Sequence, residues 1–223
     1  GGDVIQMMWS YDDPQTGSFA ERMKQHGINN IEDFRKGINK FADTLRYLET
    51  GNQDNTKGRN IRAQGGFTDK EGKYGRKNAR IDYKDLKDHA RGWYQFKPSA
   101  VDTAAQRTAN FWSALEGKRH RVEDIEHQFK WVAQRDNDDF HEKMSDAEQR
   151  EMMLINIFMG NGSWDAIGNY LDPRQSAEGK AQSLIDLYDI HHYKGPNLDI
   201  ENVRQRESEF RQFAEEEGSD IYG

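Results

Sequence analysis

The sequence predicts a mainly α-helical protein with one small β-hairpin. Apolar residues recur at helical spacing over most of the chain, and capping and stop signals frame these runs. One glycine-rich segment has the composition of a hairpin. The chain has 223 residues, which is enough for one domain with a core of ordinary size and peripheral arms.

Composition narrows the classes of function. A formal net charge of −7 argues against a protein that mainly binds nucleic acid, because phosphates attract clustered Lys and Arg, and the basic run "GKRHRVED" is short. The absence of cysteine excludes disulfides, thiol nucleophiles and Cys-ligated zinc. No His-Glu-x-x-His motif occurs, so we expect no metal site. No cofactor is expected either. We also expect no membrane span, since no apolar run approaches the required length.

The first half of the chain divides at about residue 30. Residues 1–30 contain the apolar patch "VIQMMW", the turn "YDDPQTG" and a short helical stretch, and we expect an N-terminal arm that packs on the body. A main domain is expected over residues 31–195. Its first helix is indicated by apolar residues three or four apart and stops at Gly51, which puts Glu49 on the last turn; these residues are Ile31, Phe34, Ile38, Phe41, Leu45 and Leu48.

A long loop follows this helix. Residues 50–80 are rich in Gly, Asn, Asp and Lys and include "FTDKEGKYG", which predicts a small hairpin. The next segment, "IDYKDLKDHARG", predicts a short helix or an extended link.

The second half is expected to be helical almost throughout. Helices are predicted over 99–115 and 122–140, and a Ser145 and Glu148 capping box opens the next one. Helices through Tyr170 and to about Tyr188 follow, separated by a break at residues 172–173. Residues 196–223 are expected to form a charged C-terminal helix and tail.

Two motifs stand in a specific order. The first is "LRYLETGN", which places Glu49 at a helix end before Gly and Asn, and the second is "RGWYQFKPS", residues 91–99, which contains the motif from Gly92 to Pro98. This order resembles the goose-type lysozyme and lytic transglycosylase superfamily, including transglycosylase modules of phage virion proteins. In that family the catalytic Glu is followed by Ser or Thr, Gly and Asn, and a Gly-x-x-Gln-[Ile/Phe]-x-Pro segment lies downstream. The resemblance covers residues 31–115 and extends towards 171, and it implies a lysozyme-like α-helical domain.

The third family block departs from the pattern. The family carries Ala-Tyr-Asn-x-Gly before another helix, whereas this chain has Phe158 and Met159 in "NIFMGNGSW". Asn161 or Tyr170 is the expected substitute for the polar contact to the sugar.

The resemblance implies cleavage of the β-1,4 bond between N-acetylmuramic acid and N-acetylglucosamine, with Glu49 as general acid and base. Such an acid must hold its proton near neutral pH, and neighbouring aromatic rings would favour this by desolvation. A lytic transglycosylase would use the substrate's own N-acetyl group and close a 1,6-anhydro ring. A hydrolytic muramidase would need a second carboxylate, for which Asp54, Asp69 and Glu71 are candidates.

The second motif would supply the sugar contacts. Gln95 is expected to hydrogen-bond the glycan, Gly92 to let the backbone approach it, and Trp93 or Tyr94 to pack on a pyranose face, with Phe96 in the same wall. Core packing is the competing interpretation for the three aromatic residues.

Peptidoglycan glycan strands are the implied substrate, and the implied place of action is the periplasm or cell wall. Delivery as a phage virion component or by secretion fits the acidic charge, and virion or secretion-machine proteins are then the expected partners. The alternative is a non-enzymatic helical structural or scaffolding protein with a degenerate lysozyme-like fold, which the altered third block favours.

Overall fold

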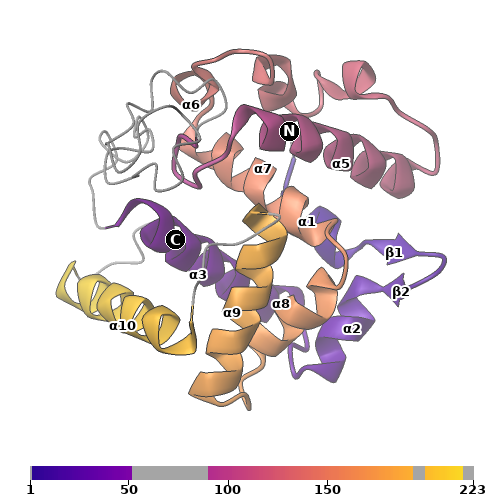
Figure 1. Ribbon diagram of the computed structural model, residues 1–223. Coiled ribbons are helices and arrows are strands. Elements are labelled where there is room, and N and C mark those ends of the chain that lie inside the picture. The colour runs from indigo at the N-terminus through magenta and orange to yellow at the C-terminus, as the bar shows by residue number, and fades with distance from the viewer. Residues whose placement is uncertain (1, 52–89, 193–198, 218–223) are drawn as a thin grey trace, which may run out of the picture.

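The computed structural model describes residues 2–51, 90–192 and 199–217. Helices dominate these residues (Figure 1), and a two-stranded antiparallel sheet accompanies them. The predicted fold class, mainly α with a small β-hairpin, is confirmed. The strands are β1 (Asp12–Asp13) and β2 (Gly17–Ser18). The hairpin predicted at 67–75 and the link after it lie outside the described residues.

The N-terminal segment contributes to the common core. It contains α1 (Val4–Trp9), capped by Asp3, and α2 (Phe19–Gln25), capped by Ser18. Each helix is short and buries two side chains in the hydrophobic core: Ile5, Met8, Phe19 and Met23. Helix formation here therefore depends on packing as well as on the caps.

Helix α3 (Ile31–Thr50) has the predicted bounds. The Asn30 side chain accepts from the Asp33 amide at its start, and Gly51 ends it with φ +68°. Its apolar face is buried, as the spacing predicts.

Helix α7 (Asp146–Phe158) forms the centre of the fold. The predicted capping box is present, with Ser145 Oγ accepting from the Glu148 amide and the Glu148 carboxylate accepting from the Ser145 amide. Every residue from 152 to 158 is buried, so this helix is enclosed on all sides. It packs on α5 (Pro98–Glu116) and α9 (Ala177–His192).

The remaining helices complete the packing. α8 (Ser163–Leu171) lies along α9, and α10 (Ile200–Glu217) packs on α9 and α3, as Figure 1 shows. None of the helices in the described part of the chain is both long and apolar enough to cross a membrane.

One predicted helix is wrong. Residues 122–140 form two 3₁₀ helices, η2 (Val122–Ile125) and η3 (Lys130–Gln134), before the short α6 (Phe140–Lys143). Phe129 and Trp131 are both fully buried. Residues two apart lie on opposite sides of an α-helix, so a helix that packs on the core by one face alone would leave one of the two exposed, whereas the 3₁₀ segments bury both.

Candidate functional site

The Gly-x-x-Gln motif forms a closed turn. The backbones of Arg91 and Phe96 exchange two hydrogen bonds of 3.0 and 3.1 Å. Between them Gly92 has φ +85° and Gln95 has φ +51°. A Cβ on Gly92 would lie 2.6 Å from Gln149 Oε1, so the close neighbour that requires glycine is a protein side chain.

Gln149 of α7 holds this turn. Its Oε1 accepts from the Trp93 amide at 2.9 Å, and its Nε2 donates to the carbonyls of His141 and Met144 at 3.1 and 3.4 Å. The side chain is buried, and these bonds satisfy it. Arg91 fixes the other side of the turn by donating to the Asp138 carbonyl and by pairing with its carboxylate at 2.7 Å.

The three aromatic side chains of the motif are buried. Trp93, Tyr94 and Phe96 are 1%, 2% and 3% exposed. The Arg46 guanidinium lies over the Trp93 ring at 3.1 Å, and Phe96 meets the His191 ring at 4.9 Å. In place of the expected sugar-stacking wall, Trp93 and Tyr94 are enclosed by protein, so core packing describes them.

The C-terminal half of α3 carries buried polar groups that the sequence analysis missed. Asp43, Arg46 and Thr50 are only 4–5% exposed and lie on one face of the helix. Arg150 of α7 pairs with Asp43 at 2.5 Å and hydrogen-bonds the Tyr94 hydroxyl. Three segments that are distant in sequence thus meet in one polar cluster.

The two arginines of this cluster stay charged, and its tyrosine stays neutral. Burial lowers the pKa of Arg46 to about 10, which leaves the guanidinium protonated at neutral pH. Burial also acts to lower the pKa of Arg150, but Tyr94 and Asp43 together raise it. Burial raises the pKa of Tyr94, so it remains a phenol.

Glu49 lies on the last turn of α3 and is partly buried. The Tyr188 hydroxyl of α9 hydrogen-bonds its side chain. Burial, followed by the charge of Glu49, raises the pKa of Tyr188, which therefore stays protonated and donates. Nothing in the sequence near Tyr188 points to this contact.

Helix α9 connects Glu49 to the turn. Tyr188 contacts Glu49, and three residues later His191 Nε2 lies 2.7 Å from the Tyr94 carbonyl. Residues three apart share a helix face, so one face of α9 meets both the end of α3 and the turn at residues 91–96.

The predicted substitutes in the third block lie elsewhere. Asn161 is exposed and lines a separate pocket with Arg22 and Asp165. Tyr170 is buried and hydrogen-bonds Thr44.

Gln95 lines a pocket of about 410 Å³ at the N-terminus of α5. Its own Nε2 donates to the Gly92 carbonyl at 2.9 Å. The pocket is lined by the following residues, among which Glu49 does not occur: Gln95, Phe96, Lys97, Ser99, Ala100, Thr103, Arg107, Asn156, Ile190 and His191. Gln95 and Phe96 therefore line this pocket. Glu49 does not line it and is linked to the turn indirectly, through Tyr188 and His191 of α9.

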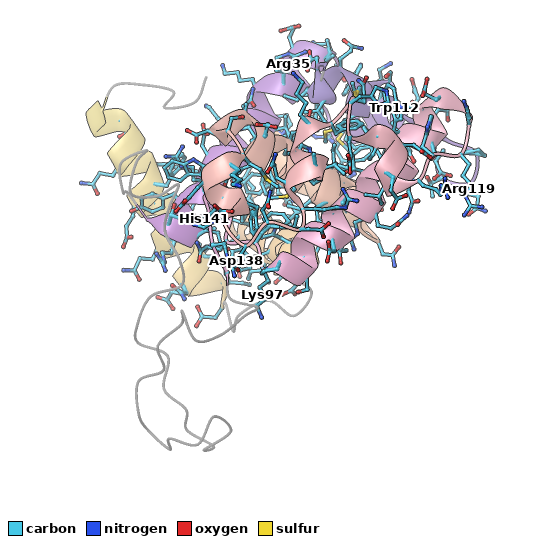
Figure 2. The ribbon with its side chains drawn as sticks, turned by 90° about the horizontal axis from the view of Figure 1, so that it is seen from above. Arg35, Lys97, Trp112, Arg119, Asp138 and His141 are labelled. Carbon is cyan, nitrogen blue, oxygen red and sulfur yellow. The ribbon has the colours of Figure 1, made fainter. Side chains whose placement is uncertain are left out.

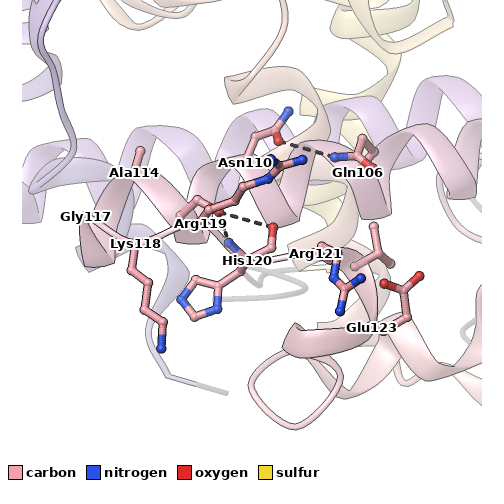
Figure 3. Close-up of a pocket in the computed structure, with 11 residues that line it drawn as sticks. Gln106, Asn110, Ala114, Gly117, Lys118, Arg119, His120, Arg121 and Glu123 are labelled. Carbon is pink, nitrogen blue, oxygen red and sulfur yellow. Dashed lines mark hydrogen bonds between the residues drawn. The ribbon is translucent and has the colours of Figure 1, made fainter.

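A second pocket, of about 680 Å³, lies where the basic run leaves α5 (Figure 3). The His120 amide donates to Ser113 Oγ at 2.8 Å, which folds the run back on the helix. Charges of both signs line it, including Lys118, Arg119 and Glu123. The Glu123 carboxylate distinguishes this pocket from the one beside Gln95, whose described lining contains no carboxylate.

No group of three or more His, Cys, Asp or Glu that could hold a metal ion occurs within residues 2–51, 90–192 and 199–217. The candidate second carboxylates Asp54, Asp69 and Glu71 lie outside the described residues. Comparison with protein-family models, curated proteins and solved structures found no match for this chain.

Proposed function

We propose that this protein cleaves peptidoglycan glycan strands at the β-1,4 bond between N-acetylmuramic acid and N-acetylglucosamine, with Glu49 as general acid and base. The observation that supports the proposal is the joint contact of α9 with Glu49 and with the Gly92–Gln95 turn. Two short motifs that are more than 40 residues apart thereby form one constellation, in the order seen in lytic transglycosylases.

The residues fit the chemistry. Protonated Glu49 gives its proton to the glycosidic oxygen as the C1–O bond breaks, and the N-acetyl oxygen of the same sugar forms a bond to C1. The Glu49 carboxylate then takes the proton from the C6 hydroxyl, whose oxygen displaces the N-acetyl oxygen and closes the 1,6-anhydro ring. Tyr188 donates a hydrogen bond to the carboxylate form and thereby holds its orientation.

Zymography on purified peptidoglycan tests the proposal. Glu49→Gln should reduce cleavage by roughly 10²- to 10⁴-fold, because the amide cannot transfer a proton. Glu32→Gln, on the exposed first turn of the same helix, is the matched control and should retain full activity. A fully active Glu49→Gln variant would show that another residue is the acid.

Tyr188→Phe tests the positioning role. It removes only the hydroxyl, so we expect roughly a tenfold fall in kcat with little change in KM, since a positioning bond affects the reacting geometry more than binding. Mass spectrometry of the released muropeptides distinguishes anhydro ends from the reducing ends of a muramidase.

A second candidate function is structural. Phe158, which occupies the family's tyrosine position, is fully buried and contacts the rings of Tyr11, Phe19 and Phe111. At this position of the third block the chain has a core residue in place of a polar residue that could contact the sugar. This favours a non-enzymatic virion or secretion-machine component. Absence of cleavage by the wild-type chain would support this candidate over the enzyme.

For either candidate we propose the setting expected from the sequence. The enzyme would act in the periplasm or cell wall after delivery by a phage particle or by secretion, and virion or secretion-machine proteins would be its partners.

A further inference from the structure

The pocket beside Gln95 has a positive lining. Lys97 and Arg107 contribute cations, and among the residues that the structure describes none that lines the pocket is an Asp or Glu. This is unusual in a chain with a net charge of −7. Figure 2 shows Lys97 at the edge of the molecule, well away from Arg119 of the other pocket.

Arg107 is the most informative of the lining residues. It is half-buried, and its Nη1 donates to the carbonyl and to the side-chain oxygen of Asn156 at 2.8 and 3.0 Å. Asn156 is itself only 3% exposed, so the guanidinium is held in place. Burial lowers the pKa of Arg107.

Arg107 makes no ion pair with any residue that the structure describes, unlike Arg91 and Arg150. Arg91 pairs with Asp138 at 2.7 Å and Arg150 with Asp43 at 2.5 Å. A partly desolvated guanidinium that is anchored through one nitrogen retains donors for an anion.

The N-terminus of α5 also favours an anion in this pocket. The pocket includes Ser99 and Ala100 in the first turn of α5, a helix of 19 residues whose N-cap residue, Lys97, provides no side-chain cap. The positive end of the helix dipole therefore adds to the two cations.

We infer that this pocket binds a carboxylate of the peptide stem carried by the muramic acid of the glycan strand. One fixed guanidinium and one exposed ammonium match a single carboxylate better than a polyphosphate. Phe96, Ala100 and Ile190 give the same pocket an apolar side, which suits the small side chains of a short peptide. Gln95, the residue expected to hydrogen-bond the glycan, also lines this pocket.

This assignment rests on the proposed function for the identity of the ligand, and calorimetry tests it separately. The probe is a soluble disaccharide tetrapeptide, N-acetylglucosaminyl-N-acetylmuramyl-peptide, compared with the same molecule after amidation of its carboxyl groups. The wild-type chain should bind the carboxylate form about tenfold more tightly, which is the effect of one charge-assisted hydrogen bond.

Two variants and a control locate the effect. Arg107→Gln should lose this tenfold preference, and its circular dichroism and thermal unfolding show whether it still folds. Lys97→Gln changes an exposed side chain and should lower the preference about threefold without affecting the fold. Arg119→Gln, also exposed but in the other pocket, should keep the full preference.

The outcomes separate the two proposals. Equal binding of both probes by the wild type, no binding at millimolar concentration, or an undiminished preference in both the Arg107 and Lys97 variants would overturn the carboxylate site. If cleavage of glycan strands without peptides accompanied that result, the proposed function would stand. Carboxylate-dependent binding without any strand cleavage would overturn the proposed function and leave the carboxylate site in place.

Discussion

The two halves of α3 lie in interiors of different chemistry. In the first half, Phe34 packs on the rings of Trp9 and Phe19 at 5.5 and 5.2 Å. In the second half, Asp43 and Arg46 are as deeply buried as many core residues, yet they bear charges. One continuous helix therefore joins an apolar core to a polar cluster.

The two interiors contribute differently to the fold. The apolar interior adds stability that depends little on which residues meet, whereas the polar interior determines which residues meet. Apolar rings are stabilised wherever they leave water, so the first interior tolerates changes of partner. A buried charge is stable only beside its own partner, so the second interior fixes the relative positions of α3, α7 and the turn at residues 91–96. Glu49 lies at the polar end, where such fixed positions matter most for chemistry.

The largest effect should come from breaking the buried ion pair. Arg150→Met leaves the Asp43 carboxylate without this cation and should lower the free energy of unfolding by about 3–5 kcal/mol, measured by urea denaturation. Arg35→Met is the matched control, because the Arg35–Asp3 pair is similarly short at 2.6 Å but lies at the surface. That change should cost at most about 1 kcal/mol. Equal losses in the two variants would show that burial does not distinguish the pairs.

The next effect concerns the turn that the polar cluster holds. Gly92→Ala combines a left-handed φ with a clash against Gln149 and should destabilise the protein by about 2–4 kcal/mol. Gly117→Ala has a similar φ of +66° but open space around its Cβ, so about 1 kcal/mol is expected. The difference between the thermal unfolding midpoints of the two variants measures the effect of the clash with Gln149. Equal midpoints would show that the turn at residues 91–96 accommodates a Cβ at position 92 without a measurable loss of stability.

Much of the fold was predictable because it depends on local signals. The bounds of α3 follow from apolar spacing and a stop glycine, and those of α7 from a capping box that the structure contains. Residues 122–140 escaped prediction because their apolar spacing mimics a helix, whereas the need to bury Phe129 and Trp131 together overrides it. That requirement is tertiary and leaves no local signal.

The candidate site was predictable only where residues are adjacent in sequence. The motif from Gly92 to Gln95 and the helix-terminal position of Glu49 could be read directly. Tyr188, Gln149 and Arg107 could not, because their roles come from contacts across the fold with partners about 50 to 140 residues away. Core packing was one of two interpretations of Trp93 and Tyr94, and the sequence could not decide between them, because it does not show that Arg46 covers the Trp93 ring.

The smallest effect concerns a carboxyl group within the central helix. Glu151 of α7 is partly buried, and burial raises its pKa to about 7 from an ordinary value of 4.5. Between about pH 4.5 and pH 7, Glu151 is therefore protonated in the folded state and largely deprotonated in the unfolded chain. The stability that this proton contributes is complete below about pH 4.5 and is lost as the pH rises through about 7.

We therefore expect Glu151→Gln to flatten the decline in unfolding free energy between pH 5 and pH 8 by about 2 kcal/mol. Glu32→Gln, on the exposed first turn of α3, should leave the slope of the wild type unchanged. Urea denaturation at both pH values measures the slope. An identical slope in the Glu151 variant would mean that water reaches this carboxyl group, and the polar interior would then be confined to the surroundings of the turn at residues 91–96.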